Sequence, residues 1–299
     1  MSSITLGIVG YGEVGKTFAK GLLGKPGITS ICAWDVNFQA GAATADAERA
    51  HAEAQAAWPM PGMAGLCAQA TLVISAVTAS NTLAVAEEAA RHLRAGTIFL
   101  DLNSASPGTK QQAARAIDGA GGRYVEAGVM TSVPPYGIAV PMLLGGNHAE
   151  ALAQTLSAWG MNARAVASEI GVASAIKMCR SIMIKGMEAL VIESYATARR
   201  YGVEAHVLPT LQETFPQIDW ARTGAYFFSR VAQHGKRRAE EMREAARTVQ
   251  EAGFPPTMAA AIAEKHDWVA AKAREGLFRD VPADAPWQQW ADRLIERKG

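Results

Sequence analysis

A glycine-rich segment directly follows the first apolar run of the chain and constrains the fold more than any other feature. The run ITLGIVG, residues 4–10, is typical of a β-strand, and Gly10, Gly12 and Gly15 then form a Gly-x-Gly-x-x-Gly pattern. The first glycine permits a tight turn, the second leaves room beside the backbone, and the third permits close packing of a helix on the strand. This order of strand, turn and helix predicts a parallel sheet with crossover helices.

The first half of the chain continues the alternation. Runs rich in β-branched and aromatic residues predict further strands over residues 28–35, 70–77, 96–103, 122–129 and 139–146. Helices are predicted between them over residues 14–23, 39–55, 84–93 and 109–117. We therefore predict an α/β Rossmann domain with a doubly wound, mostly parallel sheet over residues 1–167.

The second half changes character after about Ser168. The β-rich runs cease, and apolar residues recur at spacings of three and four, which is typical of amphipathic helices. The longest helix is predicted from about Val172 to Tyr201 and should end at Gly202. Later helices are predicted to be separated by Pro209, Gly235 and the GFPP at 253–256. An all-α C-terminal domain is therefore predicted over residues 168–299.

The composition indicates a soluble globular chain and narrows the class of partner. Of 299 residues, 49% are hydrophobic and 19% are charged, and 29 basic side chains nearly balance 28 acidic ones. This balance gives no electrostatic reason to expect a nucleic acid or a membrane surface, so we expect a small-molecule partner. Three widely spaced cysteines without metal-ligand spacing predict reduced thiols and no metal site. With no leader or membrane span in the sequence, we expect a cytoplasmic protein.

Asp35 completes a pattern that is typical of dinucleotide-binding sites. It ends the second predicted strand, twenty residues after Gly15, where a carboxylate accepts hydrogen bonds from an adenosine ribose. Its charge would repel a 2′-phosphate, so NAD is favoured and NADP is not excluded; alternatively, Asp35 caps a neighbouring turn. The residues predicted to bind the cofactor, some of them through backbone amides at the helix start, are Gly10, Tyr11, Gly12, Glu13, Val14, Gly15, Asp35, Val77, Thr78 and Asn103.

Polar residues at the ends of later strands are candidate substrate ligands, because ligands of such sheets bind beyond the carboxyl ends of the strands. Ser104 follows the strand predicted at 96–103. Ser106, just after it, also has the sequence of a helix cap, since Pro107 follows. Thr131 and Ser132 follow the next strand, in a segment whose backbone amides are expected to bind a substrate anion.

Four segments, in order, resemble the β-hydroxyacid dehydrogenase superfamily, which includes 3-hydroxyisobutyrate and 6-phosphogluconate dehydrogenases. They are the glycine motif, DLNSASPGT at 101–109, EAGVMTSVPP at 126–135 and GVASAIKMCRS at 171–181. The stretch KMCRSIMIKGMEAL at 177–190 further resembles a sparsely characterised branch that is similar to 6-phosphogluconate dehydrogenase and has a C-terminal domain of unknown function. The resemblance implies substrate-binding roles for the middle two segments and a homodimer formed through the helical domain.

Lys177 is the residue that the resemblance identifies as catalytic. A dehydrogenase needs a group that takes the hydroxyl proton while hydride leaves the same carbon. A lysine can do this when desolvation and a positive nicotinamide lower its pKa. From the sequence alone, a lysine in the apolar stretch IGVASAIKM is more often a surface residue that extends its amine to solvent.

The chain departs from the family just after this lysine. Where the family usually shows Asn or His, Arg180 stands, followed by Ser181, and both are predicted to bind substrate. Arg180 either binds a carboxylate or phosphate bidentately or pairs with Glu188 or Glu193. Lys185 and Glu188 share the helical face of the lysine, with no role assigned. Glu188 does not align with the acid of 6-phosphogluconate dehydrogenases, which weakens the case for that substrate.

A second departure lies further along the helical half. Counting back from Gly253, Glu240 and Glu241 replace a Lys-Asp pair that the family presents near the nicotinamide. His234 and Arg238, about one turn earlier, either reach the site or belong to a solvated helix face. The aromatic residues within 219–230 either line a pocket for an aromatic or bulky substrate or, as favoured here, pack in the core and at a dimer interface.

Together these features predict an NAD(P)-dependent dehydrogenase that acts on a β-hydroxy acid or a related secondary alcohol, with the corresponding keto acid as its product. Lys177 would be the general base in oxidation and the acid in reduction. Two alternatives remain. Imine reductases share the architecture, although they usually carry Asp or Tyr at the lysine position, and an NAD-binding sensor or scaffold would need no turnover.

Overall fold

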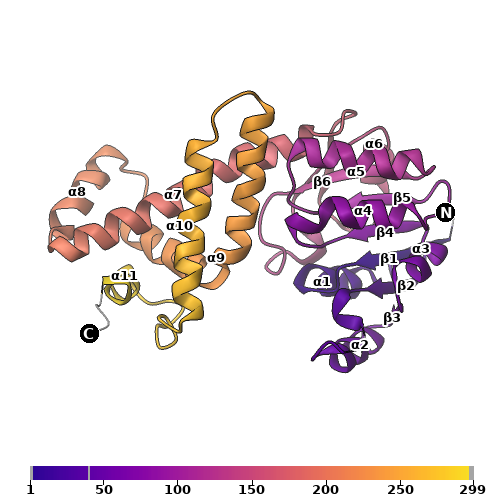
Figure 1. Ribbon diagram of the computed structural model, residues 1–299, viewed down its shortest axis with the longest axis horizontal. Coiled ribbons are helices and arrows are strands. Elements are labelled where there is room, and N and C mark those ends of the chain that lie inside the picture. The colour runs from indigo at the N-terminus through magenta and orange to yellow at the C-terminus, as the bar shows by residue number, and fades with distance from the viewer. Residues whose placement is uncertain (1–2, 40, 296–299) are drawn as a thin grey trace. The chain divides into compact units, whose positions relative to one another are not determined.

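The computed structural model describes residues 3–39 and 41–295, and the chain divides into two compact units, Met1–Met178 and Cys179–Gly299 (Figure 1). The first unit contains all the strands of these residues, and the second is built from helices. The division falls inside one long helix. The predicted boundary between residues 167 and 168 stays a prediction about independently folding domains.

The first unit is organised around an eight-stranded sheet in the order β3-β2-β1-β4-β5-β6-β7-β8. Its strands are β1 (Ile4–Val9), β2 (Ile28–Trp34), β3 (Ala57–Pro59), β4 (Leu72–Ser75), β5 (Ile98–Asp101), β6 (Arg123–Val129), β7 (Met142–Gly145) and β8 (Ala163–Ala167). All neighbours pair in parallel except β6 and β7, which are antiparallel. The predicted doubly wound, mostly parallel sheet is confirmed, and its order reverses between β1 and β4.

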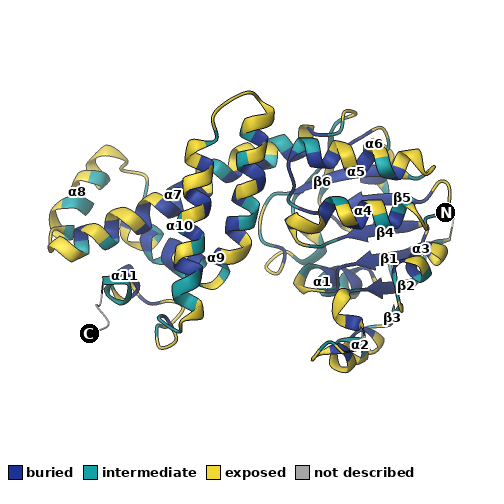
Figure 2. Ribbon diagram, viewed as in Figure 1, coloured by how far each residue is buried: buried dark blue, intermediate teal, exposed yellow. Residues whose placement is uncertain are grey.

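Helices cover both faces of this sheet. They are α1 (Glu13–Leu22), α2 (Ala45–Ala54), α3 (Met63–Gln69), α4 (Thr82–Ala90), α5 (Pro107–Gly119) and α6 (Ala149–Ala158), with short 3-10 turns η1 (Val36–Phe38), η2 (Ala79–Asn81) and η3 (Gly137–Ala139). One hydrophobic core includes residues of α1 and α6, and a second includes residues of α3, α4 and α5. Figure 2 shows the strands largely buried between helices whose outer surfaces are exposed.

Several elements of the first unit differ from the sequence prediction. The helix predicted over 39–55 is shorter: η1 precedes that range and α2 begins at Ala45, because Gly41 has a φ of +96°, outside the helical region. The short strands β3 and β8 and the helices α3 and α6 were not predicted. By contrast, the predicted start of α5 is confirmed, since the Ser106 hydroxyl accepts a hydrogen bond from the Thr109 amide and Pro107 is the first helical residue.

The second unit consists of long helices around its own core. The helices are α7 (Val172–Tyr201), whose first residues belong to the first unit, α8 (Glu204–Thr214), α9 (Trp220–Glu251), α10 (Thr257–Arg274) and α11 (Trp287–Ile295). Gly202, with a φ of +69°, follows α7 as predicted. Of the described residues, none belong to a helix that is both long enough and apolar enough to cross a membrane.

Two predicted helix breaks are wrong, and so is the prediction that α7 is the longest helix. Gly235 lies inside α9, which has 32 residues against 30 in α7. A Cβ on Gly235 would lie 2.8 Å from the His266 carbonyl oxygen, so this glycine permits close packing of α9 on α10 rather than ending a helix. Pro209 lies inside α8, where the carbonyl that loses its partner belongs to Ala205, an exposed residue.

Candidate active site

The glycine turn after β1 has the geometry that its sequence predicts. Gly10 has a φ of +90°, and a Cβ there would lie 2.5 Å from the Ala76 carbonyl oxygen. A Cβ on Gly15 would lie 2.0 Å from the Gly10 carbonyl oxygen, so only glycine allows α1 to pack this closely. Gly12 differs, because a Cβ there would meet no atom within 4 Å. The turn therefore leaves an open space beside the Gly12 backbone.

The start of α1 faces this space. Gly12 is the N-cap residue, and no side chain caps the helix there, so the backbone amides of Glu13 and Val14 begin α1 at the positive end of its dipole, with Glu13 as an acidic residue of the first turn. Such an end binds an anion. The residues present therefore fit the pyrophosphate of a dinucleotide.

Asp35 caps a neighbouring turn, which is one of the two roles that the sequence left open, and its role in ribose binding stays a prediction. It is the N-cap of η1, where its carboxylate accepts a hydrogen bond of 2.8 Å from the Asn37 amide. Its other oxygen accepts one of 2.6 Å from the Tyr11 amide and so ties β2 to the glycine turn. Each carboxylate oxygen can accept a further hydrogen bond, which leaves acceptors for ribose hydroxyls. The Tyr11 side chain is buried and its ring packs against Phe38 and His51, and the predicted role of Tyr11 in cofactor binding stays a prediction.

Asn103 links the ends of β4 and β5. Its Oδ1 accepts a hydrogen bond of 2.7 Å from the Val77 amide, and its Nδ2 donates one of 2.9 Å to Ser75 Oγ. The side chain is buried, which makes Asn103 a brace between two strand ends more than an exposed ligand. Thr78 is exposed just beyond and bonds with Ser80 and Asn81.

A buried ion pair lies beneath this loop. Lys110 and Asp101 are both fully buried, with Nζ 2.9 Å from Oδ1, and Asp101 Oδ1 also accepts the Asn103 amide at 2.9 Å. Asp101 Oδ2 accepts a hydrogen bond of 2.6 Å from the Tyr124 hydroxyl. Burial and the nearby Asp101 charge raise the pKa of Tyr124 well above its ordinary value, so the hydroxyl stays a donor. The network fixes the backbone that leads into Ser104.

Lys177 reaches Ser104 directly. Its Nζ lies 2.5 Å from Ser104 Oγ, and both residues are half-buried in the first unit. This contact joins the first turns of α7 to the loop after β5. Lys177 and Ser104 are therefore in contact, Lys177 is not extended into solvent, and their common role in a site stays a prediction.

The start of α7 is held by Glu126 of β6, which is fully buried. Its Oε1 accepts hydrogen bonds from the amides of Gly171 at 2.7 Å and Ala173 at 3.0 Å, and its Oε2 accepts one from Ser174 at 3.3 Å. One carboxylate thus satisfies three amide donors that a helix start leaves without partners.

Thr131 and Ser132 lie in the loop that follows β6. The Met130 amide still donates to the Pro141 carbonyl, and the buried Val133 anchors the loop's other side. Thr131 is exposed and Ser132 is half-buried. Both predicted ligands therefore stand at the carboxyl end of β6, at the same edge of the sheet as Ser104.

Arg180 and Ser181 belong to the second unit. Arg180 is exposed and forms no ion pair with any described residue, because Glu188 pairs with Arg238 and Glu193 with Lys265. Neither acid named as a partner of Arg180 is therefore in contact with it. Ser181 is buried.

The residues of α7 and α9 with open roles form a buried cluster in the second unit. Arg238 binds Glu188 through two hydrogen bonds, and Lys185 lies 2.7 Å from Glu241. His266 of α10 is fully buried, with Nε2 3.6 Å from Glu188. Burial, with the positive charges of Arg238 and Lys185, lowers the pKa of His266 to about 3, so the ring is neutral. Arg238 thus belongs to this core and not to a solvated face.

Other residues of the second unit also have settled environments. Trp220, Phe227 and Phe228 belong to its hydrophobic core, as favoured from the sequence, whereas Tyr226 is exposed. His234 is half-buried.

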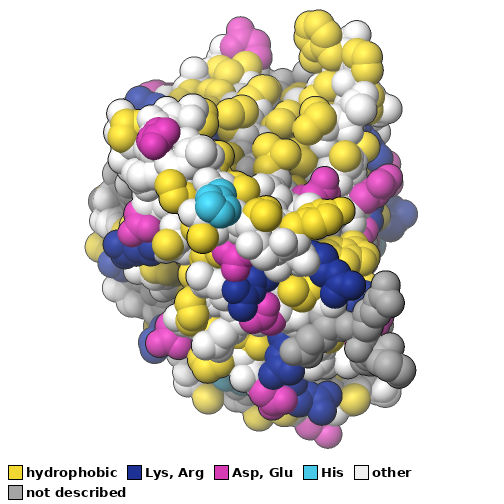
Figure 3. Space-filling model, turned by 90° about the vertical axis from the view of Figure 1, so that its left-hand side faces the viewer, with side chains coloured by type: hydrophobic (Ala, Val, Ile, Leu, Met, Phe, Trp, Pro, Cys, Tyr) yellow, Lys and Arg dark blue, Asp and Glu magenta, His cyan; other side chains and the backbone are white. Residues whose placement is uncertain are grey.

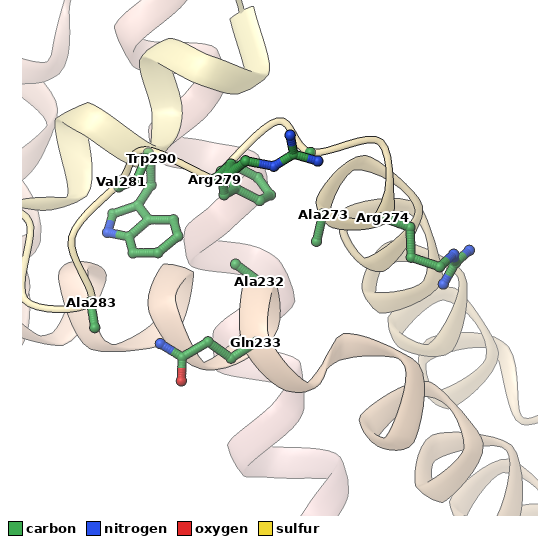
Figure 4. Close-up of a pocket in the computed structure, with 10 residues that line it drawn as sticks. Ala232, Gln233, Ala273, Arg274, Arg279, Val281, Ala283 and Trp290 are labelled. Carbon is green, nitrogen blue, oxygen red and sulfur yellow. The ribbon is translucent and has the colours of Figure 1, made fainter. Parts of the chain in front are cut away.

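A cavity of about 310 Å³ lies among α9, the end of α10 and the segment that leads to α11, with Arg279 and Trp290 in its wall (Figure 4). None of the predicted site residues line it.

The cysteines and possible metal ligands suggest no further chemistry. Cys32 and Cys67 are buried, and burial raises the pKa of Cys32 to about 11 and of Cys67 to about 12. Both therefore remain protonated thiols, which are poor nucleophiles and metal ligands. Within residues 3–39 and 41–295, no group of three or more His, Cys, Asp and Glu side chains could hold a metal ion.

Sequence reasoning missed the buried polar residues that support the site, namely Asp101, Lys110, Tyr124 and Glu126. A usable signal existed for two of them. Asp101 and Glu126 are acids inside otherwise apolar strand runs, and a carboxylate in such a place needs a buried partner. The partner of each could not be read from the sequence, because it depends on which segments the fold brings together.

Comparisons with known proteins agree with this architecture. Residues 5–167 match the family described as the NAD binding domain of 6-phosphogluconate dehydrogenase, and residues 198–269 match a domain of unknown function. A conserved hypothetical protein from Sinorhizobium meliloti is 39% identical, with a TM-score of 0.77, over 98% of this chain and 96% of its own.

Two further solved structures are similar. One is a conserved protein of unknown function whose reported structural similarity is with 3-hydroxyacid dehydrogenases; it is 30% identical, with a TM-score of 0.69, over 91% of this chain and 98% of its own. The other is a 3-hydroxyisobutyrate dehydrogenase from Mycobacterium tuberculosis, with a TM-score of 0.70 over 98% of this chain and 100% of its own. At 15% identity, the last shows a shared fold alone.

Proposed function

Because the chain belongs to the family that carries the NAD binding domain of 6-phosphogluconate dehydrogenase, we propose that it is an NAD(P)-dependent oxidoreductase acting on a β-hydroxy acid or a related secondary alcohol. The observation that carries the proposal is the hydrogen bond between Lys177 Nζ and Ser104 Oγ at the carboxyl edge of the sheet. An amine held at that edge is placed where a ligand of this fold binds.

Lys177 is the proposed general acid and base. When bound, the nicotinamide would accept or supply the hydride, and Lys177 would take the hydroxyl proton in oxidation or return it in reduction. Ser104 accepts a hydrogen bond from the amine and would donate its own O–H to the same substrate oxygen. Because Lys177 is half-buried, it can exchange a proton with a substrate without being fully solvated.

The substrate is proposed to carry an anionic group. Thr131, Ser132 and the amides of their loop would bind a carboxylate at the end of β6, and Arg180 and Ser181 stay predicted substrate ligands of the second unit. Support for Arg180 comes from its lack of an ion pair among the described residues, which leaves its guanidinium available for bidentate binding.

The first experiment is a spectrophotometric screen that follows NADH or NADPH absorbance with β-hydroxy acids, sugar acids and aryl-substituted hydroxy acids. Lys177→Ala should lower kcat by about a hundredfold or more, since positioned acid-base groups typically contribute that much. Lys20→Ala, at an exposed lysine of α1, is the matched control and should keep wild-type kcat.

The outcomes separate the alternatives. Turnover of hydroxy acids that is lost in Lys177→Ala supports the dehydrogenase. Reduction of cyclic imines, with no activity on hydroxy acids, would identify an imine reductase instead. Cofactor binding without turnover of either class would favour a sensor or scaffold.

NAD is the preferred cofactor in this proposal, and NADP is not excluded. The Asp35 carboxylate would accept hydrogen bonds from ribose hydroxyls and repel a 2′-phosphate. Asp35→Ala should therefore raise the KM for NAD by about tenfold to a hundredfold while kcat at saturating NAD changes little. Equal NAD affinity in Asp35→Ala and wild type would contradict the ribose assignment.

A homodimer through the helical unit completes the proposal. Leu190, Tyr201, Phe215 and Tyr226 are all at least half exposed, and Figure 3 shows hydrophobic side chains gathered on a face of this unit. Exposed apolar patches of this kind mark interaction sites. Sedimentation equilibrium should give twice the chain mass; a monomer at all concentrations would refute the dimer.

A cytoplasmic location is also proposed, because the three free cysteines suit a reducing compartment.

A further inference from the structure

Glu126 is an unusual residue to find in the middle of a central strand. It is 0% exposed, and an isolated carboxylate in such a place would be neutralised or would destabilise the fold. Its charge is accommodated because the amides of Gly171, Ala173 and Ser174 all donate to it. These amides form the first turn of α7, whose dipole adds a favourable interaction with a negative charge.

Two glycines lie close to Glu126 and to the start of α7. Gly145 is the partner of Glu126 in the β6–β7 pairing, and a Cβ on Gly145 would lie 2.6 Å from Glu126 Oε1. Gly128, two residues further along β6, faces α7: a Cβ there would lie 2.8 Å from the Ala173 carbonyl oxygen and 3.5 Å from Lys177 Cβ. Gly145 thus leaves room for the Glu126 carboxylate, Gly128 allows α7 to approach β6 closely, and Glu126 accepts hydrogen bonds from amides at the start of α7.

Lys177 follows one turn after these amides. Since residues four apart lie on the same side of a helix, a shift of the Ala173 amide is transmitted to the Lys177 backbone through the rigid turn. Asp101 has the corresponding role for the loop that carries Ser104. Its carboxylate accepts hydrogen bonds from the Asn103 amide and the Tyr124 hydroxyl and forms an ion pair with Lys110. Asp101 and Glu126 are themselves paired positions of β5 and β6.

We propose that Glu126 is a positioning residue for proton transfer: by holding the first turn of α7, it aligns Lys177 Nζ with Ser104 Oγ. Glu126 does not touch the reacting atoms. The inference rests on the proposed function in that Lys177 is the acid and base.

The test is Glu126→Gln, which keeps the size of the side chain and removes its charge. The oxygen of glutamine can still accept from the Gly171 and Ala173 amides, but its NH2 group is a donor and would face the Ser174 amide, so the first turn should move. Because misplacement of a reacting group by about 1 Å can cost about a hundredfold, kcat should fall by about tenfold to a hundredfold, and its pH profile should shift. The Kd for NADH, measured by fluorescence, should stay within about twofold.

The matched control is Glu150→Gln, the same substitution at an exposed acid in the first turn of α6. It should leave kcat, the pH profile and NADH binding unchanged. Glu126→Asp is the second variant if Glu126→Gln does not fold. It keeps the charge but is one methylene shorter, so it should bond fewer of the three amides and lose less of kcat.

One readout is independent of turnover. Lysines are labelled by reductive ¹³C-methylation, and the Lys177 resonance, assigned with Lys177→Ala, is titrated by NMR in wild type and in the Glu126 variants. A changed titration of Lys177 in a folded Glu126 variant supports the inference even if no substrate is found. An unchanged titration in a folded variant overturns it, and so does a wild-type kcat with a wild-type pH profile. Absence of turnover in wild type overturns the proposed function and leaves the NMR result to decide the role of Glu126.

Discussion

The two units bury their charged side chains in different ways. In the first unit, Asp101 and Glu126 accept hydrogen bonds from backbone amides, one at the loop before Ser104 and the other at the start of α7. In the second unit, Glu188 and Glu241 pair with the side chains of Arg238 and Lys185. The first arrangement fixes pieces of backbone, whereas the second joins one helix to another.

This difference predicts how each region tolerates change. A backbone amide cannot be removed by substitution, so a buried acid that serves it has no apolar replacement. A buried pair of side chains can be replaced on both sides by apolar groups of similar volume at little cost. We therefore expect the polar residues of the first unit to be required by the site, and those of the second to be exchangeable.

The largest effect is expected from Arg238→Met. It leaves Glu188 buried without its main partner and should lower the free energy of unfolding by about 3–5 kcal/mol, as measured by urea denaturation. Adding Glu188→Leu should recover most of this loss. Lys272→Met, at an exposed pair with Glu275, is the control and should change stability by less than about 1 kcal/mol. A double variant as unstable as Arg238→Met alone would remove the contrast between the units.

The corresponding double variant in the first unit should not recover. Lys110→Met with Asp101→Leu removes both charges, but the Asn103 amide and the Tyr124 hydroxyl lose their acceptor. Two buried donors without partners should keep the free energy of unfolding about 3 kcal/mol below wild type. Adding Tyr124→Phe to this double variant removes the unpaired hydroxyl, so it should restore only the part of the lost free energy of unfolding that this hydroxyl causes. Recovery of full stability by the first double variant would show that the backbone amide finds another acceptor.

A pH dependence of stability is expected from the buried His266. Its folded pKa is lowered from 6.5 to about 3, so between these values the unfolded chain binds a proton that the folded chain does not. Stability is therefore complete above about pH 6.5 and falls as the pH falls, by about 2 kcal/mol from about pH 7 to about pH 5. In urea denaturation, the free energy of unfolding of His266→Phe should therefore fall by about 2 kcal/mol less than that of wild type over the same pH range. Parallel pH curves for both proteins would refute the assignment to His266.

The sequence predicted the fold where local signals agree with tertiary packing. The glycine turn, the Ser106-Pro107 cap and α7 follow from short-range chemistry, and the superfamily and branch inferred from four segments are confirmed. The short strand β3 carries too few residues for a periodic signal. Pro209 and Gly235 were wrongly predicted to end helices. The Ala205 carbonyl that Pro209 leaves without a partner is exposed to water, and Gly235 packs against a neighbouring helix; local sequence specifies neither environment.

The candidate site was predicted only as far as its exposed chemistry. Lys177 and Ser104 were predicted to belong to one site, and the structure brings their side chains into contact, while their roles stay predictions. Glu126, Lys110 and Tyr124 were not, because their roles come from residues that are distant in the chain and meet only after folding. Assignments of the ligands of the cofactor and substrate stay predictions that the kinetic variants above address.

The smallest effect is expected at Gly235, the residue whose role the sequence misjudged. Gly235→Ala gains about 1 kcal/mol of helix propensity, but its Cβ would lie 2.8 Å from the His266 carbonyl and 3.1 Å from Ala270 Cβ. Overpacking of this kind costs about 2 kcal/mol, so urea denaturation should show a net loss of about 1 kcal/mol. Gly119→Ala in α5, where a Cβ meets no atom within 4 Å, is the matched control and should be neutral or slightly stabilising. If both substitutions raise the free energy of unfolding, α9 and α10 can move apart to accept the added Cβ. The ion pairs would then contribute more to the stability of the second unit than the close packing of these two helices.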